Sequence, residues 1–356
     1  MKAKASVIVS IVFACCLLWQ KRDNDSLFPP SSQVLAINGQ TMGTTYMVKI
    51  AEDLPAAVDL KHIKHKIAEL LETVNQQMST YIVDSELSQF NREEANKWFP
   101  VSLATAFVID SALKISRDSD GAFDVTMGNL VNLWGFGPLA ERQEPPEDQE
   151  IKSLLSQLGS THLHSRLNPA AVMKSSNKLY VDLSGIAKGY GVDVLYDYLS
   201  SLGLSHFMVE IGGEIRASGQ KFLRNWEIAI EEPVVGSGRG GVHQVLQLGT
   251  NAIATSGDYR NYFEDGDKQY SHLLDPRTGY PISHKLASVT VIAATTMEAD
   301  AWATAFFVMG PDKIKSIAAK KEMAVYMIVK NQSGFSHWHS QEFQQYFKFS
   351  RAHSEA

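Results

Sequence analysis

An aspartate and a threonine spaced four residues apart are the first candidates for chemistry in this sequence. Asp300 and Thr304 lie in the segment 295–311, which opens with a Thr-x-x-Glu capping box and closes with a Gly-Pro stop. Residues four apart on a helix project from one face, so both side-chain oxygens would point the same way. Two such oxygens make half of a site for a hard divalent cation such as Mg²⁺. The alternative interpretation is an exposed helical turn that binds nothing.

A second candidate is a glycine-rich segment that follows a predicted strand. The strand, residues 179–183, leads through a turn into a helix that runs to about Leu202, and glycines occur at Gly185, Gly189 and Gly191. Each glycine lowers helix propensity by about 1 kcal/mol. Their presence at a helix start therefore indicates that another group approaches the backbone closely, and the amides there favour negative charge.

Two further patterns carry less weight. The pairs His162/His164 and His337/His339 could each place two imidazoles on one face of a strand. Neither pair has a third ligand nearby in the sequence, and the second pair lies in a polar tail. The segment 236–241 has the spacing of a dinucleotide-binding fingerprint, but it joins two predicted strands and opens no helix, so it is interpreted as a hairpin loop.

The elements that must position these residues do not alternate regularly. Apolar spacing and capping signals predict helices over 58–78, 84–90, 102–116 and 147–158. Asn38-Gly39 is a hairpin signal within 34–50, and the aromatic, glycine-rich stretch 132–138 is typical of a packed loop. Further strands are predicted as two short pieces within 171–183 and as 207–216 with a Gly-Gly break, 226–230, 242–248, 286–294 and 323–329. This order favours an α+β fold of mixed, largely antiparallel sheets packed with helices.

Composition and charge are those of an ordinary globular protein. The chain has 356 residues, of which 44% are hydrophobic, so it can bury a large core in one large domain or two closely joined ones. Its net charge is -6, and no block of like charges occurs. A nucleic-acid surface would need a basic stripe, so the composition disfavours nucleic acid as a partner.

The N-terminus has the pattern of an export signal. Residues 1–19 combine a basic start with an uncharged apolar run that is shorter than the roughly 18 to 20 residues needed to span a bilayer. The sequence around Cys15 and Cys16 loosely resembles a lipoprotein box, which predicts a lipid anchor there, and an uncleaved short anchor is the alternative. Both cysteines of the chain lie in this segment, so the mature domain can form no internal disulfide. Residues 20–33 are polar and breaker-rich, as a linker should be.

Eight segments, taken in order, resemble the FAD:protein FMN transferases, the ApbE family, formerly called thiamine-biosynthesis lipoproteins. The resemblance spans about 36–329, and it implies a transferase domain over 34–345 with T-fold-like architecture, followed by a polar tail at 346–356. The matching segments are Met42-Gly43-Thr44, Met78-Ser79-Thr80-Tyr81 with Asp84-Ser85-Glu86-Leu87, Gly121-Ala122-Phe123-Asp124, Leu133-Trp134-Gly135-Phe136-Gly137, Asp182 to Tyr190, Ser256-Gly257-Asp258-Tyr259, Asp275-Pro276-Arg277-Thr278-Gly279, and Ala299 to Thr304.

The resemblance implies a reaction and a set of residues. In this family FAD is held with Mg²⁺ on its pyrophosphate, and FMN passes to a threonine of an acceptor protein through a phosphoester bond while AMP is released. His272 and Asp300 would be the catalytic residues. The implied flavin contacts are Met42, Tyr81, Ala122, Phe123, Asp124, Ser184, Tyr190 and Leu274, and the implied metal ligands are the carbonyl of Ala187 and the side chains of Asp300 and Thr304.

Physical chemistry is consistent with these implied roles. Phosphoryl-type transfer needs charge neutralisation on the pyrophosphate and in-line placement of the nucleophile more than covalent help. His272 could accept the threonine proton or orient a phosphate oxygen, and Tyr81 and Phe123 offer flat surfaces to an aromatic ring. Without the resemblance, Tyr81 and Phe123 would be interpreted as core aromatics, His272 as a structural histidine and Met42 as a packing residue.

The expected acceptors are exported or membrane redox proteins, such as subunits of a sodium-translocating NADH:quinone reductase. The expected location is the periplasmic side of a bacterial inner membrane, with the N-terminus as tether. Two alternatives stay open: a Mg²⁺-dependent FAD pyrophosphatase, in which water replaces the threonine, and a flavin-binding lipoprotein without catalysis.

Overall fold

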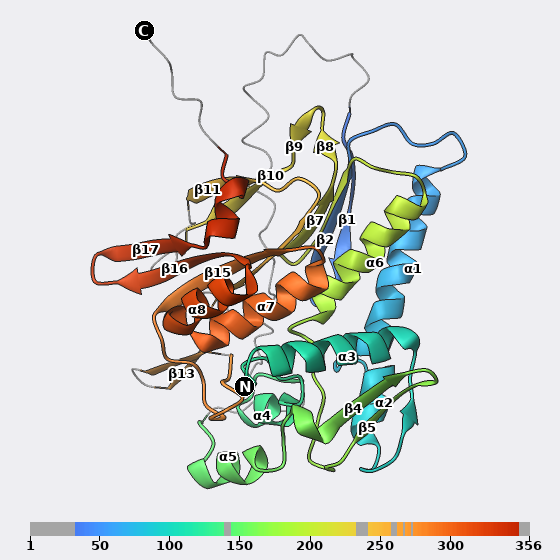
Figure 1. The fold of residues 1–356 in the computed structure, drawn as a ribbon. Helices are drawn as coiled ribbons and strands as arrows, with labels where there is room; N and C mark the ends of the chain where they lie inside the picture. The colour runs from blue at the N-terminus through green and yellow to red at the C-terminus, as the bar shows by residue number, and fades with distance from the viewer. Residues whose placement is uncertain are drawn as a thin grey trace, which may run out of the picture.

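The computed structural model describes residues 33–138, 144–232, 241–257, 262–265, 268–271 and 273–348 (Figure 1). The predicted signal segment with Cys15 and Cys16, most of the loop 236–241, and His272 lie outside these ranges. Among the residues that are described, no helix is both long enough and apolar enough to cross a bilayer.

One eight-stranded sheet forms the centre of the fold. All neighbouring strands are antiparallel, in the order β1-β2-β6-β7-β12-β15-β16-β17. Their bounds are β1 Leu35–Thr41, β2 Thr44–Ile50, β6 Phe207–Ile211, β7 Glu214–Ser218, β12 Ala252–Gly257, β15 Leu286–Ala293, β16 Ala324–Asn331 and β17 Gly334–His339. The predicted α+β class with largely antiparallel sheets is therefore confirmed.

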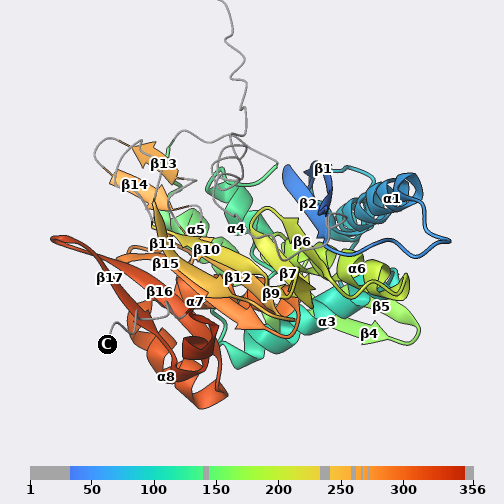
Figure 2. The same ribbon diagram turned by 90° about the horizontal axis from the view of Figure 1, so that it is seen from above.

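The two faces of this sheet are covered differently. In β6, Phe207, Val209 and Ile211 pack toward helices, whereas Met208 packs toward the opposite side. The helices on the first face are α1 Leu60–Met78, α6 Ala187–Ser201, α7 Thr296–Met309 and α8 Pro311–Lys321 (Figure 1). The second face is covered by a hairpin and a short 3₁₀ helix, which are β10 Glu227–Glu231, β11 Val242–Gln247 and η2 Gln341–Tyr346 (Figure 2).

A smaller layer packs against the helical side. Its three-stranded sheet has the order β3-β5-β4, and its helices share the large core cluster with α7. The bounds are α2 Glu86–Arg92, β3 Phe99–Pro100, α3 Leu103–Asp118, α4 Gly128–Leu133, α5 Asp148–Leu155, η1 Ser160–His162, β4 Leu163–Leu167 and β5 Ala170–Lys174. The remaining short strands are β8 Gln220–Lys221, β9 Arg224–Asn225, β13 Tyr262–Asp265 and β14 Lys268–Ser271.

Helix α7 begins and ends where the sequence predicts. The hydroxyl of Thr295 accepts a hydrogen bond from the backbone N–H of Glu298 at 3.3 Å. At the other end Gly310 has φ 77°, a conformation that glycine adopts without strain. The helix is buried on almost every side, and Asp300 is only 3% exposed. The alternative interpretation of this segment as an exposed helical turn is therefore wrong.

The first hairpin turns at a different place from the one predicted. Gly39 lies inside β1, where an added Cβ would meet the ring of Tyr46 at 2.4 Å. The turn is Met42-Gly43, with φ values of 50° and 70°. Two successive positive φ angles match the twist of the flanking strands. The Asn38-Gly39 signal is therefore wrong as a turn, because the packing of Tyr46 is what requires glycine there.

Three other strand and loop predictions need correction. The segment 207–216 is a hairpin of β6 and β7 that turns at Gly212-Gly213, where both φ angles are positive. The segment 171–183 contains one strand, β5, and beyond it only an isolated bridge from Tyr180 to Met127. The aromatic stretch 132–138 is not entirely a loop, since its first two residues end α4.

Several described elements have no counterpart in the sequence-based prediction, and β4, α8 and β17 are examples. Each is exposed over much of its length, so its apolar pattern is weak. His337 and His339 lie on β17 at the edge of the main sheet, and not in a polar tail.

Candidate active site

The starts of α6 and α7 cross in direct backbone contact. A Cβ atom on Gly189 would lie 2.4 Å from the carbonyl oxygen of Thr296 and 2.8 Å from the Cα of Met297. No side chain fits there, so the glycine in the predicted glycine-rich segment allows this crossing. Asp193, one turn further along α6, accepts hydrogen bonds from the N–H groups of Thr296 at 2.9 Å and Met297 at 2.8 Å.

The crossing brings Asp300 to the start of α6. One carboxylate oxygen of Asp300 accepts a hydrogen bond from the N–H of Gly189 at 3.0 Å. Thr304, one turn on, lies against Gly185, since a Cβ added there would be 3.4 Å from the threonine hydroxyl oxygen. Ala187, the first residue of α6, lies between these two contacts in the sequence. The structure thus brings Asp300 and Thr304 to the segment that contains Ala187.

A lysine and a second carboxyl group complete this point. The ammonium nitrogen of Lys188 lies 3.2 Å from Oε1 of Glu214 and 3.5 Å from Oδ1 of Asp300. The other oxygen of Glu214 is buried and has no hydrogen-bond partner among the described residues. The sequence pattern does not single out Lys188 or Glu214, although Lys188 lies inside a matching segment. Glu214 is a buried acid at the start of β7, a strand that is otherwise mostly half-buried.

The charges of this cluster follow from burial and proximity. Burial raises the pKa of Glu214 to about 8, with the Lys188 ammonium acting against this rise and the Asp300 carboxylate adding to it. Burial lowers the pKa of Lys188, but the carboxylates of Asp300 and Glu214 outweigh it and hold that pKa above its ordinary value. Lys188 is therefore charged at neutral pH, and the pKa of Glu214 lies above its ordinary value.

These donors fit a hard divalent cation. Two carboxyl groups and a hydroxyl group offer oxygen atoms only, the type of ligand that Mg²⁺ prefers. The unpartnered oxygen of Glu214 is a buried acceptor that a bound ion or its water could satisfy. The single ammonium group of Lys188 does not exceed the available negative charge.

Two predicted flavin contacts meet the same start of α6 from different elements. Met42, in the turn between β1 and β2, approaches Gly191, where an added Cβ would be 2.9 Å from its methyl carbon. The ring of Phe123 approaches Gly185, at 3.2 Å from the position of an added Cβ. Phe123 is 3% exposed, so little of its ring is open to solvent.

The other predicted contacts differ in exposure. Tyr81 is 72% exposed, whereas Ala122 and Leu274 are buried in the large core cluster. Desolvation of the phenol and, second, the charge of Asp182 raise the pKa of Tyr81, which places it near the segment that leads into α6. Ser184 in that segment is exposed, and its N–H donates to Asp182 at 2.9 Å; Tyr190 is half-buried on α6.

Asp124 is already satisfied within the chain. Its carboxylate accepts hydrogen bonds from the N–H of Thr126 at 2.8 Å, from the hydroxyl of Thr126 at 2.7 Å and from the N–H of Ser160 at 2.9 Å. Burial raises the pKa of Asp124, and these hydrogen bonds act in the opposite direction. The side chain of Asp124 therefore stabilises the turn 121–126.

The predicted catalytic residue His272 lies outside the described part of the chain.

A separate cavity of about 480 Å³ lies at the other end of α7. It is lined by the turn that contains Asp275 and Arg277 together with Val308 and Met309. Arg277 makes a bidentate ion pair with Asp275, with N···O distances of 2.8 and 2.7 Å. None of the predicted flavin contacts lines this cavity, so the candidate site is the α6–α7 crossing.

Comparisons with known proteins identify the family of this chain. The model of the ApbE family matches residues 42–327. The FAD:protein FMN transferase of Vibrio cholerae is 46% identical over 315 residues, which cover 88% of this chain and 92% of that protein. The protein of the same name from Haemophilus influenzae is 40% identical over 339 residues, covering 94% and 95%.

Solved structures show the same architecture. The flavin transferase ApbE from Vibrio cholerae superposes with a TM-score of 0.82 at 44% identity, over 88% of this chain and 99% of that chain. The apo form of the flavinyl transferase ApbE from Pseudomonas stutzeri gives a TM-score of 0.80 at 35% identity, over 88% and 97%. The fold and its relatives thus define a transferase enzyme. This chain belongs to the ApbE family.

Proposed function

We propose that this protein transfers FMN from FAD to a threonine side chain of an acceptor protein and releases AMP. The observation that carries the proposal is the meeting of Asp300, Thr304 and the start of α6 at one buried, oxygen-rich point. Relatives 46% and 40% identical to this chain are named FAD:protein FMN transferase, which supports the same donor and the same transferred group.

The residues present would hold Mg²⁺ through the side chains of Asp300 and Thr304 and the carbonyl of Ala187. When bound, the ion supplies neutralisation of the negative charge on the FAD pyrophosphate, as a Lewis acid does in phosphoryl transfer. Lys188, charged and held between Asp300 and Glu214, adds a fixed positive charge beside that position. The first turn of α6 contributes the positive end of its helix dipole.

In the transfer, the threonine oxygen forms a bond to the phosphorus of the FMN half, and the bridging P–O bond to AMP breaks. The threonine proton needs an acceptor, and His272 is the residue proposed for it from the sequence. We further propose that the acceptors are exported or membrane redox proteins, such as subunits of a sodium-translocating NADH:quinone reductase. The N-terminal segment would tether the enzyme to the periplasmic side of a bacterial inner membrane through Cys15 or Cys16.

The deciding experiment follows the mass of an acceptor. The purified protein is incubated with FAD, Mg²⁺ and candidate threonine-containing acceptors, and the acceptor is weighed by mass spectrometry. A gain equal to FMN supports the transferase. AMP and free FMN without that gain would support the pyrophosphatase, and tightly bound FAD with no turnover would support a flavin-binding protein.

Replacement of Asp300 tests the site directly. We expect Asp300→Asn, which keeps the size of the side chain, to lower Mg²⁺-dependent transfer by about a hundredfold or more, since Lewis-acid stabilisation amounts to several kcal/mol. Glu298→Ala is the matched control, because Glu298 is an exposed carboxylate on the same helix. Undiminished transfer by Asp300→Asn would refute the assignment of the metal site.

A further inference from the structure

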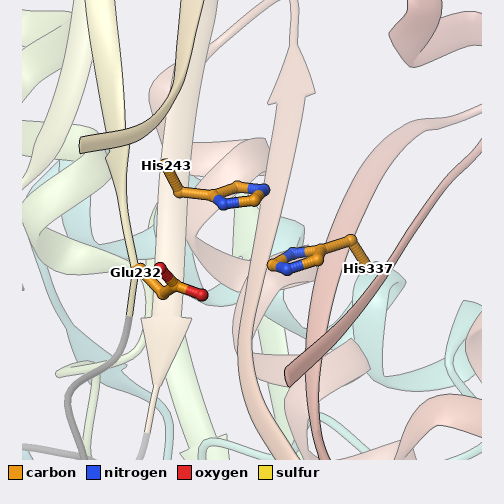
Figure 3. Close-up of side chains that lie close together, drawn as sticks. All are labelled: Glu232, His243 and His337. Atoms are coloured by element: carbon orange, nitrogen blue, oxygen red, sulfur yellow. The ribbon is translucent and has the colours of Figure 1, made fainter. Parts of the chain in front are cut away.

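Two histidines and a glutamate meet far from the α6–α7 crossing. One ligand atom each from Glu232, His243 and His337 lies within 4.8 Å of the others. Figure 3 shows the two imidazoles face to face, with the carboxylate of Glu232 directed toward their edges. The rings are 3.8 Å apart at an interplanar angle of 9°. Both are available to solvent or half-buried, so an ion could reach them.

The three residues come from separate parts of the chain. Glu232 follows the last residue of β10, His243 lies on β11, and His337 lies on the edge strand β17. The spacing of these residues in the sequence therefore does not indicate a metal site. His339, the other histidine of the His-x-His pair, does not belong to the cluster. His339 instead packs edge-on against Phe347, at 4.9 Å between ring centres.

A tyrosine orients one of the imidazoles. The hydroxyl of Tyr326 is hydrogen-bonded to Nδ1 of His337 at 3.1 Å, and Tyr326 itself is 4% exposed. With the hydrogen on Nδ1 donated to that oxygen, Nε2 of His337 keeps its lone pair for a metal. Outer partners of this kind usually orient metal-bound histidines in proteins.

We propose that Glu232, His243 and His337 form a binding site for Zn²⁺. Two imidazole nitrogens and a carboxylate oxygen, with water as a fourth ligand, are a common zinc set, and imidazole selects zinc over Mg²⁺. Ligand atoms around tetrahedral zinc lie about 3.4 Å apart, given bond lengths near 2.1 Å. The present separation of up to 4.8 Å closes by tilting the rings about their Cβ–Cγ bonds, which are soft torsions.

This site is distinct from the candidate active site. His337 is paired with Ile328, which belongs to the core cluster on the face of the sheet covered by β10 and β11. Asp300 lies on α7, which packs on the opposite face. Zinc at Glu232, His243 and His337 would join the β10–β11 hairpin to the edge of the main sheet, because β10 and β11 pair only with each other among the described strands.

Zinc titration of the full chain in excess Mg²⁺ tests the proposal, since the Mg²⁺ occupies sites that prefer hard cations. We expect one bound Zn²⁺ per chain by calorimetry and metal analysis, and an upward shift of the thermal unfolding midpoint on its addition. His337→Ala, His243→Gln and Glu232→Gln should each weaken this binding at least about tenfold and remove most of the shift.

The controls separate this site from other causes. His164→Ala removes an exposed histidine on β4 and should leave zinc binding unchanged. Circular dichroism of the zinc-free variants shows whether they fold, and Co²⁺ substituted for Zn²⁺ should give the visible absorption of a tetrahedral site in the wild type. Equal zinc affinity in the wild type and in folded His337→Ala or His243→Gln would overturn the proposal, as would the absence of a bound equivalent in the wild type.

Discussion

Replacement of Gly189 by alanine tests whether the backbone contact between α6 and α7 builds the active site. The added methyl group would lie 2.4 Å from the carbonyl oxygen of Thr296, which belongs to the first turn of α7. Backbone atoms cannot rotate away as a flexible side chain can, so the two helices must separate. The same separation would break the hydrogen bond from the N–H of Gly189 to Asp300.

The expected loss of stability follows from three contributions. In a helix alone, alanine is more favourable than glycine by about 1 kcal/mol. Overpacking typically costs about 1 to 3 kcal/mol, and a hydrogen bond to a charged group contributes about 1.5 to 3 kcal/mol. We therefore expect the free energy of unfolding of Gly189→Ala to be lower than that of the wild type by about 2 to 5 kcal/mol. Helix propensity alone would predict the opposite, a more stable variant.

Urea unfolding followed by tryptophan fluorescence measures this change, and the acceptor assay measures FMN transfer by the folded fraction. Ser200→Ala is the control, because Ser200 is exposed near the end of α6 and the change should be neutral or slightly stabilising. If Gly189→Ala were as stable as the wild type and transferred FMN at the same rate, the close crossing would not be what positions Asp300.

Three further predictions concern Asp193, Glu214 and His272. Asp193→Ala should lower the free energy of unfolding by about 3 to 5 kcal/mol, because the largely buried Arg216 loses its carboxylate partner and the start of α7 loses hydrogen-bond acceptors. Asp197 is exposed, so Asp197→Ala should leave the free energy of unfolding almost unchanged in the same urea titration. Burial raises the pKa of Glu214 from 4.5 to about 8, so the folded state keeps a proton that the unfolded state loses. The wild type should therefore lose stability relative to Glu214→Gln as pH rises from about 4.5 to about 8, by up to about 1.4 kcal/mol per pH unit, and parallel pH profiles of the two proteins would contradict this. His272→Ala should slow transfer while FAD still binds, and a variant that loses FAD affinity but keeps its rate would exclude the role of base.

The sequence by itself determined the local elements and the identity of the family. Apolar spacing predicts α1 and α3, and capping signals place the starts of α2 and α7, because these depend on residues within one or two turns. The matching segments, taken in order, are sufficient to predict the transferase family. The spacing of Asp300 and Thr304 likewise fixed their common helix face.

Tertiary structure decided which groups meet across the chain. Lys188 and Glu214 are an ion pair only because β7 packs beneath the start of α6, and that contact also sets the pKa of Glu214. The place of the first hairpin turn depended on the ring of Tyr46, which occupies the space above Gly39. His243 and His337 are almost a hundred positions apart, and only the sheet brings them to 3.8 Å. Such contacts depend on long-range packing, which no local spacing of residues encodes.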